Sequence, residues 1–395
     1  MKKRIEISYG RQFIDDQDIF TVNKSLKNKL ITTGKFVKNF EQKIKNTLNV
    51  KYAVTCINGS AALHLAFLAI NLKKGDVILM PSINFISAYR MADLMMAKIY
   101  LVDVDPLTGQ ITPQNLLKSI KKNKLKKIKA VVTMYLGGFP ENNLVFFKMK
   151  KKYNFHLIED ACHAFGAKYK LNNKKYHVGS CKHSDLSVFS FHPVKTITTG
   201  EGGAITTNNK SFAKKIELYK NHGFVRKKKY WQYDIKNLGN NYRLSDINCA
   251  LGLSQIKKMK KFIDYRKKIF LFYKKKFREL VDYIKLPNYN IQNDSSYHLF
   301  LISLNLKNLI CSKDKLFSFL NEKGIFPQYH YKPIFKFSFY KNKDHEKYYG
   351  ASEYYKNTLS LPIYFGLKKN EQAYIIKSIF KFIKLHKRVI KKKDK

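Results

Sequence analysis

The stretch SVFSFHPVKTITTGEGGAITT, residues 187–207, holds the strongest fold signal in the chain. A run with the alternation of a β-strand, Ser187 to Phe191, breaks at His192-Pro193, and Lys195 follows at once. The pair Thr198-Thr199 and a Gly-Glu-Gly-Gly turn then lead into a second strand-like run, because glycines let the backbone turn tightly. The stretch therefore predicts that Lys195 lies just beyond the end of a strand.

Outward from this stretch, short apolar runs alternate with helical patterns. Strand-like runs cover residues 52–58, 76–84, 98–106, 128–136, 155–160, 184–191 and 202–208. Helical patterns lie between several of them, at residues 60–72 and 143–154. The run AVVTMYL is apolar throughout, as strands buried on both faces are. This alternation predicts an α/β fold with a large, mostly parallel sheet covered by helices on both faces.

The pattern changes after about residue 245. A helical pattern spans residues 245–280, with Ser245 or Asp246 as its N-cap. Beyond it come a strand-like run, a helical pattern with Ser312 near its start, and a last helical pattern after Asn370. We predict a large domain over residues 1–250 and a smaller α+β domain over residues 251–395, bridged by the long helix.

Length and composition exclude several classes of protein. With 395 residues and 45% hydrophobic content, the chain can bury a substantial core. The N-terminus has no apolar segment of signal-peptide length, and no run approaches the roughly 18 apolar residues of a membrane span. The five cysteines are odd in number and none is spaced as CxxC, which argues against a disulfide framework and a zinc site. We therefore expect a cytoplasmic protein without a metal site.

The formal net charge of +48 raises the possibility of a nucleic-acid or anionic-membrane partner. Of the 76 basic residues only eight are arginine, although arginine is the better residue for phosphate forks and base edges. Lysine is also accompanied by an excess of Ile, Asn, Phe and Tyr, whose codons are all rich in A and T. We interpret the charge as compositional and expect no nucleic-acid partner. A basic binding protein on an inactive scaffold is the alternative, and steeply salt-dependent binding would mark it.

Polar residues gather at the predicted carboxyl ends of the strands, where open α/β sheets bind ligands. Gly59-Ser60 stand between a strand and a helix and could hold a phosphate at the helix N-terminus. Asp160 and Ser190 end two strands, and Lys195 follows. Each residue alone also fits a structural role, such as a turn or a helix cap. Together they predict pyridoxal phosphate (PLP), with Lys195 forming a Schiff base and Asp160 pairing with the protonated pyridine nitrogen.

Five stretches of the chain resemble the DegT/DnrJ/EryC1/StrS family of sugar aminotransferases. They are residues 58–70, 81–88, 159–169, 189–207 and 238–256, and the resemblance continues in order from about residue 8 to 385. Members of this family are PLP-dependent enzymes of fold type I that act as homodimers. The resemblance therefore implies a large mostly parallel-sheet α/β/α domain, a smaller α+β C-terminal domain and a homodimer.

The resemblance also implies roles for individual residues. Lys195 would bind the cofactor and move the proton, and Asp160 would pair with its pyridinium nitrogen. His163 stands where the family has a His or Gln near the cofactor, and Phe85 matches the aromatic residue that stacks on the ring.

Further residues would hold the cofactor phosphate. The resemblance gives this role to Gly59, Ser60 and Ser190. Asn241 matches an asparagine that reaches the phosphate of the neighbouring subunit, which would make the dimer part of the site.

Residues 295–302, 328–335 and 360–364 resemble more narrowly the subfamily that makes the pseudaminic-acid precursor. The implied reaction aminates C4 of a UDP-linked 4-keto-6-deoxy-N-acetylhexosamine, with L-glutamate as donor and 2-oxoglutarate as by-product. His330, Tyr331 and Lys332 would line the sugar-nucleotide pocket, although the same stretch also fits a strand–turn edge. A sibling 4-aminotransferase of the perosamine or bacillosamine type stays open.

Overall fold

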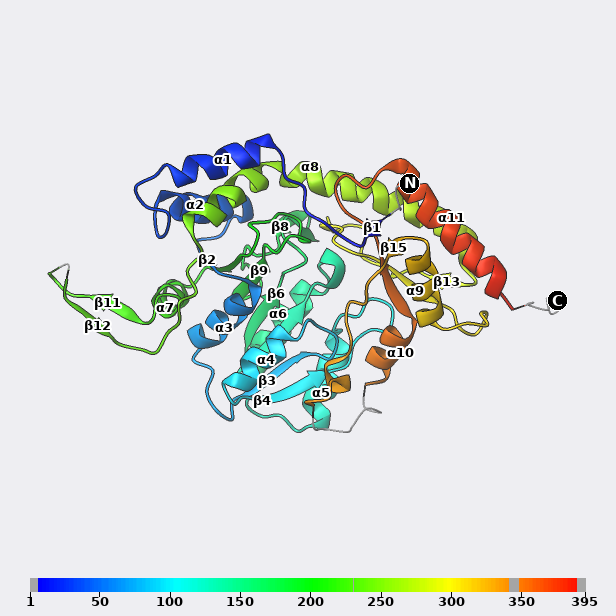
Figure 1. The fold of residues 1–395 in the computed structure, drawn as a ribbon. Helices are drawn as coiled ribbons and strands as arrows, with labels where there is room; N and C mark the ends of the chain where they lie inside the picture. Colours follow the sequence, from blue (N-terminus) through cyan, green and yellow to red (C-terminus); the bar gives the residue numbers. More distant parts are fainter. Residues whose placement is uncertain (1–5, 230, 341–347, 389–395) are drawn as a thin grey trace.

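A seven-stranded sheet forms the centre of the molecule in the computed structural model, which describes residues 6–229, 231–340 and 348–388 (Figure 1). Its strands, in spatial order, are β2 (Tyr52–Cys56), β10 (Gly203–Thr207), β9 (Leu186–Ser190), β6 (His156–Asp160), β5 (Ala130–Met134), β3 (Val77–Pro81) and β4 (Lys98–Val102). Of these seven strands, only β10 runs in the direction opposite to the other six. The predicted mostly parallel sheet is therefore confirmed.

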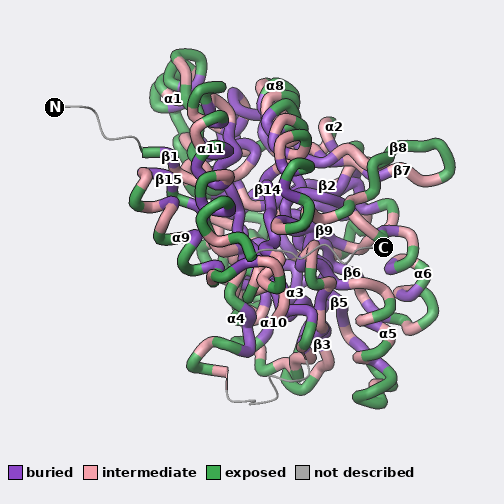
Figure 2. Tube along the Cα trace, turned by 90° about the vertical axis from the view of Figure 1, so that its right-hand side faces the viewer, coloured by how far each residue is buried: buried purple, intermediate pink, exposed green. Residues whose placement is uncertain are grey.

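The strands are apolar because helices cover them. All five residues of β5 are buried, and the tube in Figure 2 shows the strands enclosed by more exposed helices. The covering helices include α3 (Gly59–Ala69), α4 (Ser87–Leu94), α5 (Pro113–Lys122), α6 (Asn143–Tyr153) and α7 (Lys210–Tyr219). Helix α3 contributes eight buried residues to this core, so its sequence is apolar nearly all round.

The register of the parallel strands brings the predicted polar residues to one edge of the sheet. In the β5–β6 pair, Met134 lies opposite Asp160, and in the β6–β9 pair Asp160 lies opposite Val188. Ser190 is the last residue of β9, and Lys195 follows within five residues. Chain segments that leave the sheet at this edge can therefore share one site.

The C-terminal part has its own small sheet and core. Helix α8 (Asp246–Phe277) begins at the N-cap Ser245, whose side chain accepts a hydrogen bond from the Asn248 N–H. It leads into an antiparallel sheet of β13 (Ile284–Lys285), β14 (Phe300–Leu304) and β16 (Thr358–Leu361), packed with α9 (Lys313–Glu322), α10 (Tyr349–Asn357) and α11 (Lys369–His386). The predicted domain division at residue 250 falls inside α8 and stays a prediction.

The N-terminus crosses over to this C-terminal part. Strand β1 (Ile7–Ser8) pairs in parallel with β15 (Ile325–Phe326), so the first described residues contact the predicted smaller domain. Within the three described ranges, no helix is both long and apolar enough to cross a bilayer. A hairpin of β11 (Phe224–Arg226) and β12 (Tyr233–Ile235) projects away from the body of the molecule (Figure 1).

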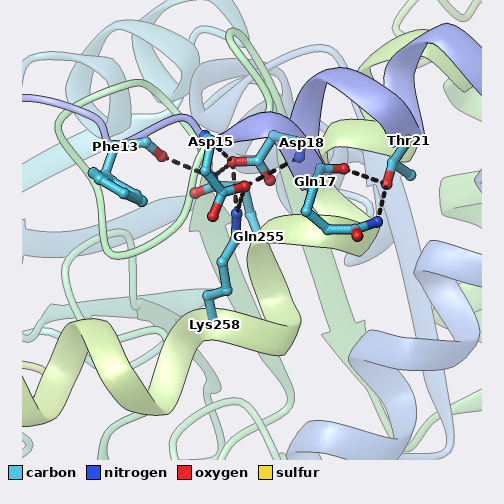
Figure 3. A network of polar contacts seen from close by, with 7 residues as sticks. All are labelled: Phe13, Asp15, Gln17, Asp18, Thr21, Gln255 and Lys258. Carbon is cyan, nitrogen blue, oxygen red and sulfur yellow. Dashed lines mark hydrogen bonds and ion pairs between the residues drawn. The ribbon is translucent and has the colours of Figure 1, made fainter.

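Helices α1 (Asp16–Leu26) and α2 (Lys35–Leu48) pack on α8, and a buried ion pair fixes α1 there (Figure 3). The Lys258 ammonium lies 2.6 Å from carboxylate oxygens of both Asp15 and Asp18. Asp18 is fully buried, and the Gln255 side chain donates a further hydrogen bond of 2.8 Å to it. Since a buried carboxylate needs a nearby cation, the position of α1 depends on Lys258.

Replacing Lys258 with Met should lower the free energy of unfolding by about 3 kcal/mol, because Asp18 would stay buried without its counter-charge. Lys260→Met is the matched control on the same helix, since Lys260 makes only an exposed pair with Asp264 and its loss should change stability by less than about 0.5 kcal/mol. Urea unfolding of both variants gives the comparison. Equal effects of the two substitutions would contradict the role assigned to Lys258.

Candidate active site

A cavity of about 570 Å³ opens at the carboxyl edge of the large sheet. This volume lies within the usual range for small-molecule sites. Nine of the eleven residues predicted for the site line it: Gly59, Ser60, Phe85, Asp160, His163, Ser190, Lys195, His330 and Tyr331. The structure therefore brings strand ends and a C-terminal segment together around one hollow.

A narrow cradle lies at the start of α3. A Cβ atom added to Gly59 would come within 3.0 Å of Ser190 Cβ and 3.4 Å of Cys162 Sγ. Glycine therefore leaves room that a larger residue would fill. The N–H groups of a first helical turn have no partner within their helix, so those of Gly59 and Ser60 can bind an anion.

A second helix begins beside this cradle. The hydroxyls of Ser60 and Ser87 lie 2.6 Å apart, and Ser87 is the first residue of α4. The N-cap of α3 is Asn58, whose side chain accepts a hydrogen bond of 2.8 Å from the Ala61 N–H. Two positive helix ends and two hydroxyls thus meet at one point, which suits a phosphate group.

Asp160 occupies the floor of the cavity at the end of β6. It is 4% exposed, and its two carboxylate oxygens accept hydrogen bonds from the Asn84 side chain at 3.1 Å and from the Cys162 N–H at 3.3 Å. Asn84 was not predicted for the site, although it is the last residue of the predicted strand 76–84 and directly precedes Phe85. These two bonds hold the carboxylate in place as an acceptor facing the cavity.

Lys195 follows β9 through a turn in which its N–H donates to the His192 carbonyl at 2.9 Å. Desolvation lowers the pKa of Lys195, whereas Cys162 and Asp160 raise it, and the Arg266 guanidinium adds a further lowering. Arg266 is itself 2% exposed and donates hydrogen bonds to the Val194 and Lys195 carbonyls. The net lowering increases the fraction of free amine near neutral pH, which a nucleophilic lysine needs.

Three buried histidines surround this lysine: His163, His298 and His330. Burial and the nearby Lys195 lower the pKa of each one, so all three are neutral imidazoles at neutral pH. The pKa of His330 falls to about 3, and its Nδ1 lies 2.8 Å from the Ser360 hydroxyl. His298 lines the cavity as well; it lies in the stretch 295–302 that carries the narrower resemblance but was not predicted for the site.

Two aromatic side chains close the cavity from other directions. Phe85 is 55% exposed although it is large and apolar, and its ring meets the Tyr331 ring edge-on at 5.8 Å. Tyr9, from the segment after β1, reaches the cavity and packs edge-on against His330 at 5.2 Å. Sequence reasoning missed Tyr9 because it stands more than 300 residues before His330, the residue on which it packs.

Two of the predicted residues lie elsewhere. Asn241 is exposed and forms an isolated antiparallel bridge with Asn221, outside the cavity of its own chain. Lys332 is exposed, and its ammonium lies 5.1 Å from the centre of the Phe337 ring. The structure therefore assembles the other nine around the cavity, while the roles of all eleven residues remain predictions.

Comparison with known proteins adds an independent line of evidence. Residues 12–380 match the DegT/DnrJ/EryC1/StrS aminotransferase family. The chain is 38% identical over 380 residues to the UDP-4-amino-4,6-dideoxy-N-acetyl-beta-L-altrosamine transaminase of Campylobacter jejuni, which covers 95% of this chain and 97% of that relative.

Two solved structures share the fold. Helicobacter pylori PseC, an aminotransferase involved in the biosynthesis of pseudoaminic acid, superimposes with a TM-score of 0.87 at 28% identity, over 96% of this chain and 100% of PseC. Streptococcus pneumoniae Spr1654, described as a sugar aminotransferase and solved in its PLP-form, gives a TM-score of 0.85 at 25% identity, over 94% and 97% of the two chains. This protein has the architecture of fold-type-I aminotransferases and belongs to the DegT/DnrJ/EryC1/StrS aminotransferase family.

Proposed function

We propose that this enzyme transfers an amino group from L-glutamate to C4 of a UDP-linked 4-keto-6-deoxy-N-acetylhexosamine, with PLP as its cofactor. The observation that carries the proposal is the shared cavity of Lys195, Asp160 and the Gly59 cradle. The identity of 38% to an altrosamine transaminase over nearly the whole chain supports the choice of sugar.

The residues present fit PLP at each of its polar groups. The cradle at Gly59, Ser60 and Ser190 suits the phosphate, and the buried Asp160 suits the ring nitrogen. Lys195 would bind the aldehyde carbon. When bound, PLP carries the amino group between the two substrates and stabilises negative charge at the reacting carbon.

The side chains of the protein supply proton transfer and control of charge. The lowered pKa of Lys195 lets its amine accept a proton near neutral pH and return it as an ammonium. Asp160 favours a positive charge on the ring nitrogen, because opposite charges in a poorly hydrated site attract strongly. The three neutral histidines add no positive charge that would compete with this pairing.

Incubating the protein with PLP, L-glutamate and the UDP-linked keto sugar should yield the 4-amino sugar, identified by mass spectrometry and NMR. Lys195→Ala should reduce turnover at least about 10³-fold, because it removes the proton-transferring amine. Lys182→Ala, which alters an exposed lysine, is the control and should retain turnover. Absence of the amino sugar, or faster conversion of a GDP-linked keto sugar, would contradict the proposed substrate.

We further propose that two copies of the chain form a homodimer with shared active sites. The projecting hairpin and the segment after it expose several large apolar side chains, at 53–91% of their surface: Trp231, Tyr233, Ile235 and Leu238. Exposed apolar groups gathered in this way favour an interface. Asn241 follows the same segment and lies outside its own cavity, as a residue serving the neighbouring subunit would.

Mixing two inactive variants tests the shared site. Dimers of Lys195→Ala or Asn241→Ala alone should each have low activity, but a mixed dimer holds one intact site that combines Lys195 of one chain with Asn241 of the other. Random reassociation should therefore restore about a quarter of the wild-type activity, since about half of the dimers are mixed and each has one intact site of two. Activity no higher than that of the separate variants would show that Asn241 does not act across the interface.

A further inference from the structure

The Tyr331 hydroxyl is held by a chain of hydrogen bonds that begins at the backbone. The Gly137 N–H donates to His163 Nδ1 at 3.3 Å, and His163 Nε2 lies 2.9 Å from Tyr331 Oη. Gly137 belongs to the 3₁₀ turn after β5, His163 follows β6, and Tyr331 comes from the C-terminal part. Three segments distant in sequence therefore meet at one hydroxyl in the cavity wall.

The first bond determines the tautomer of His163. Nδ1 accepts a hydrogen from Gly137, so it must carry a lone pair rather than a proton. Burial and the neighbouring Lys195 keep the ring neutral by lowering the pKa of His163 well below its ordinary value. A neutral imidazole holds one proton, which must therefore sit on Nε2 and be donated to Tyr331 Oη.

The tautomer of His163 also determines where the Tyr331 hydroxyl hydrogen points. Tyr331 Oη accepts the hydrogen of His163 and so must direct its own hydrogen elsewhere. Among the described residues, no hydrogen bond from Tyr331 to another protein acceptor is present, and the residue lines the cavity beside Phe85. Burial and the nearby Asp160 raise the pKa of Tyr331 well above its ordinary value, so the hydroxyl keeps its proton at neutral pH.

We propose that Tyr331, oriented by His163, donates its hydroxyl hydrogen to the carbonyl oxygen of the keto sugar and so determines specificity for a substrate with a ketone at the reacting carbon. This inference rests on the proposed function. A carbonyl oxygen only accepts hydrogen bonds, and a donor aimed at it draws electron density from the carbon that the amine attacks. His163 is then a positioning residue, because both of its ring nitrogens are engaged by the protein.

Binding to a protein that cannot turn over separates recognition from chemistry. In the Lys195→Ala background, Tyr331→Phe should weaken the affinity for the UDP-linked keto sugar about tenfold, the usual effect of one lost hydrogen bond to a buried partner, and leave the affinity for UDP unchanged. Tyr289→Phe is the matched control, because the Tyr289 hydroxyl is buried and has no hydrogen-bond partner among the described residues. Isothermal titration calorimetry measures all of these affinities.

Each result has one meaning. If the Tyr331→Phe protein bound the keto sugar as tightly as its Lys195→Ala parent, the role of Tyr331 would be overturned and the proposed function would stand. If Tyr331→Phe weakened the affinity for UDP as much as the affinity for the keto sugar, or weakened the affinity for PLP instead, the Tyr331 hydroxyl would face a group other than the sugar carbonyl. Either result would also overturn the role of Tyr331. Failure of the Lys195→Ala parent and the wild type alike to bind the keto sugar would overturn the proposed function itself.

Two substitutions of His163 test the positioning. In the otherwise wild-type protein, His163→Gln should keep the affinity and kcat for the keto sugar within about threefold, since an amide can accept from Gly137 and donate to Tyr331 at once. His163→Leu has a similar volume without polar atoms and should lower the affinity for the keto sugar about tenfold, as Tyr331→Phe does, while the affinity for UDP stays unchanged. Equal behaviour of the two His163 variants would show that the ring only fills space.

Discussion

The site depends on the electrostatic interaction between the half-buried Lys195 amine and the buried Asp160 carboxylate, which line the same cavity. Desolvation alone would lower the pKa of the lysine further, and the carboxylate opposes that effect. Arg266, a second buried cation that donates hydrogen bonds to the Val194 and Lys195 carbonyls, adds a smaller lowering of the same pKa. Lys195 and Asp160 reach the same cavity because β6 and β9 are parallel neighbours whose carboxyl ends share one edge of the sheet.

The rest of the fold holds this edge in place and covers it. Helix α8 connects the two parts of the chain, and its ion pair with α1 secures the N-terminal helices on one side. The chain start returns through β1 to β15 and places Tyr9 over the cavity, beside the segment that carries His330 and Tyr331. The cavity is therefore built from both ends of the chain, and proton positions within it, such as that on His163, depend on contacts between distant segments.

Local pattern was sufficient to predict much of this architecture. Strand runs, helix N-caps such as Ser245 and strand-end polar residues such as Asp160 are encoded over a few neighbouring residues, and the predicted sheet agrees with the observed one. Tyr9 was missed because its place in the site arises from tertiary packing, which leaves no periodic or motif signal. His298 lies in the recognised stretch 295–302, but no local pattern indicates that its side chain faces the cavity. Lys332 was predicted for the site because it is adjacent to Tyr331 in sequence. Its ammonium instead lies near the Phe337 ring, outside the cavity.

The most direct test of the account is to find which lysine binds PLP. The protein would be incubated with PLP, reduced with borohydride and digested, and the modified peptide identified by mass spectrometry. The account predicts one stoichiometric adduct on Lys195, because among 68 lysines it combines a lowered pKa with Asp160 and a phosphate cradle in one cavity. Adducts scattered over exposed lysines, or a single adduct at another lysine, would contradict it.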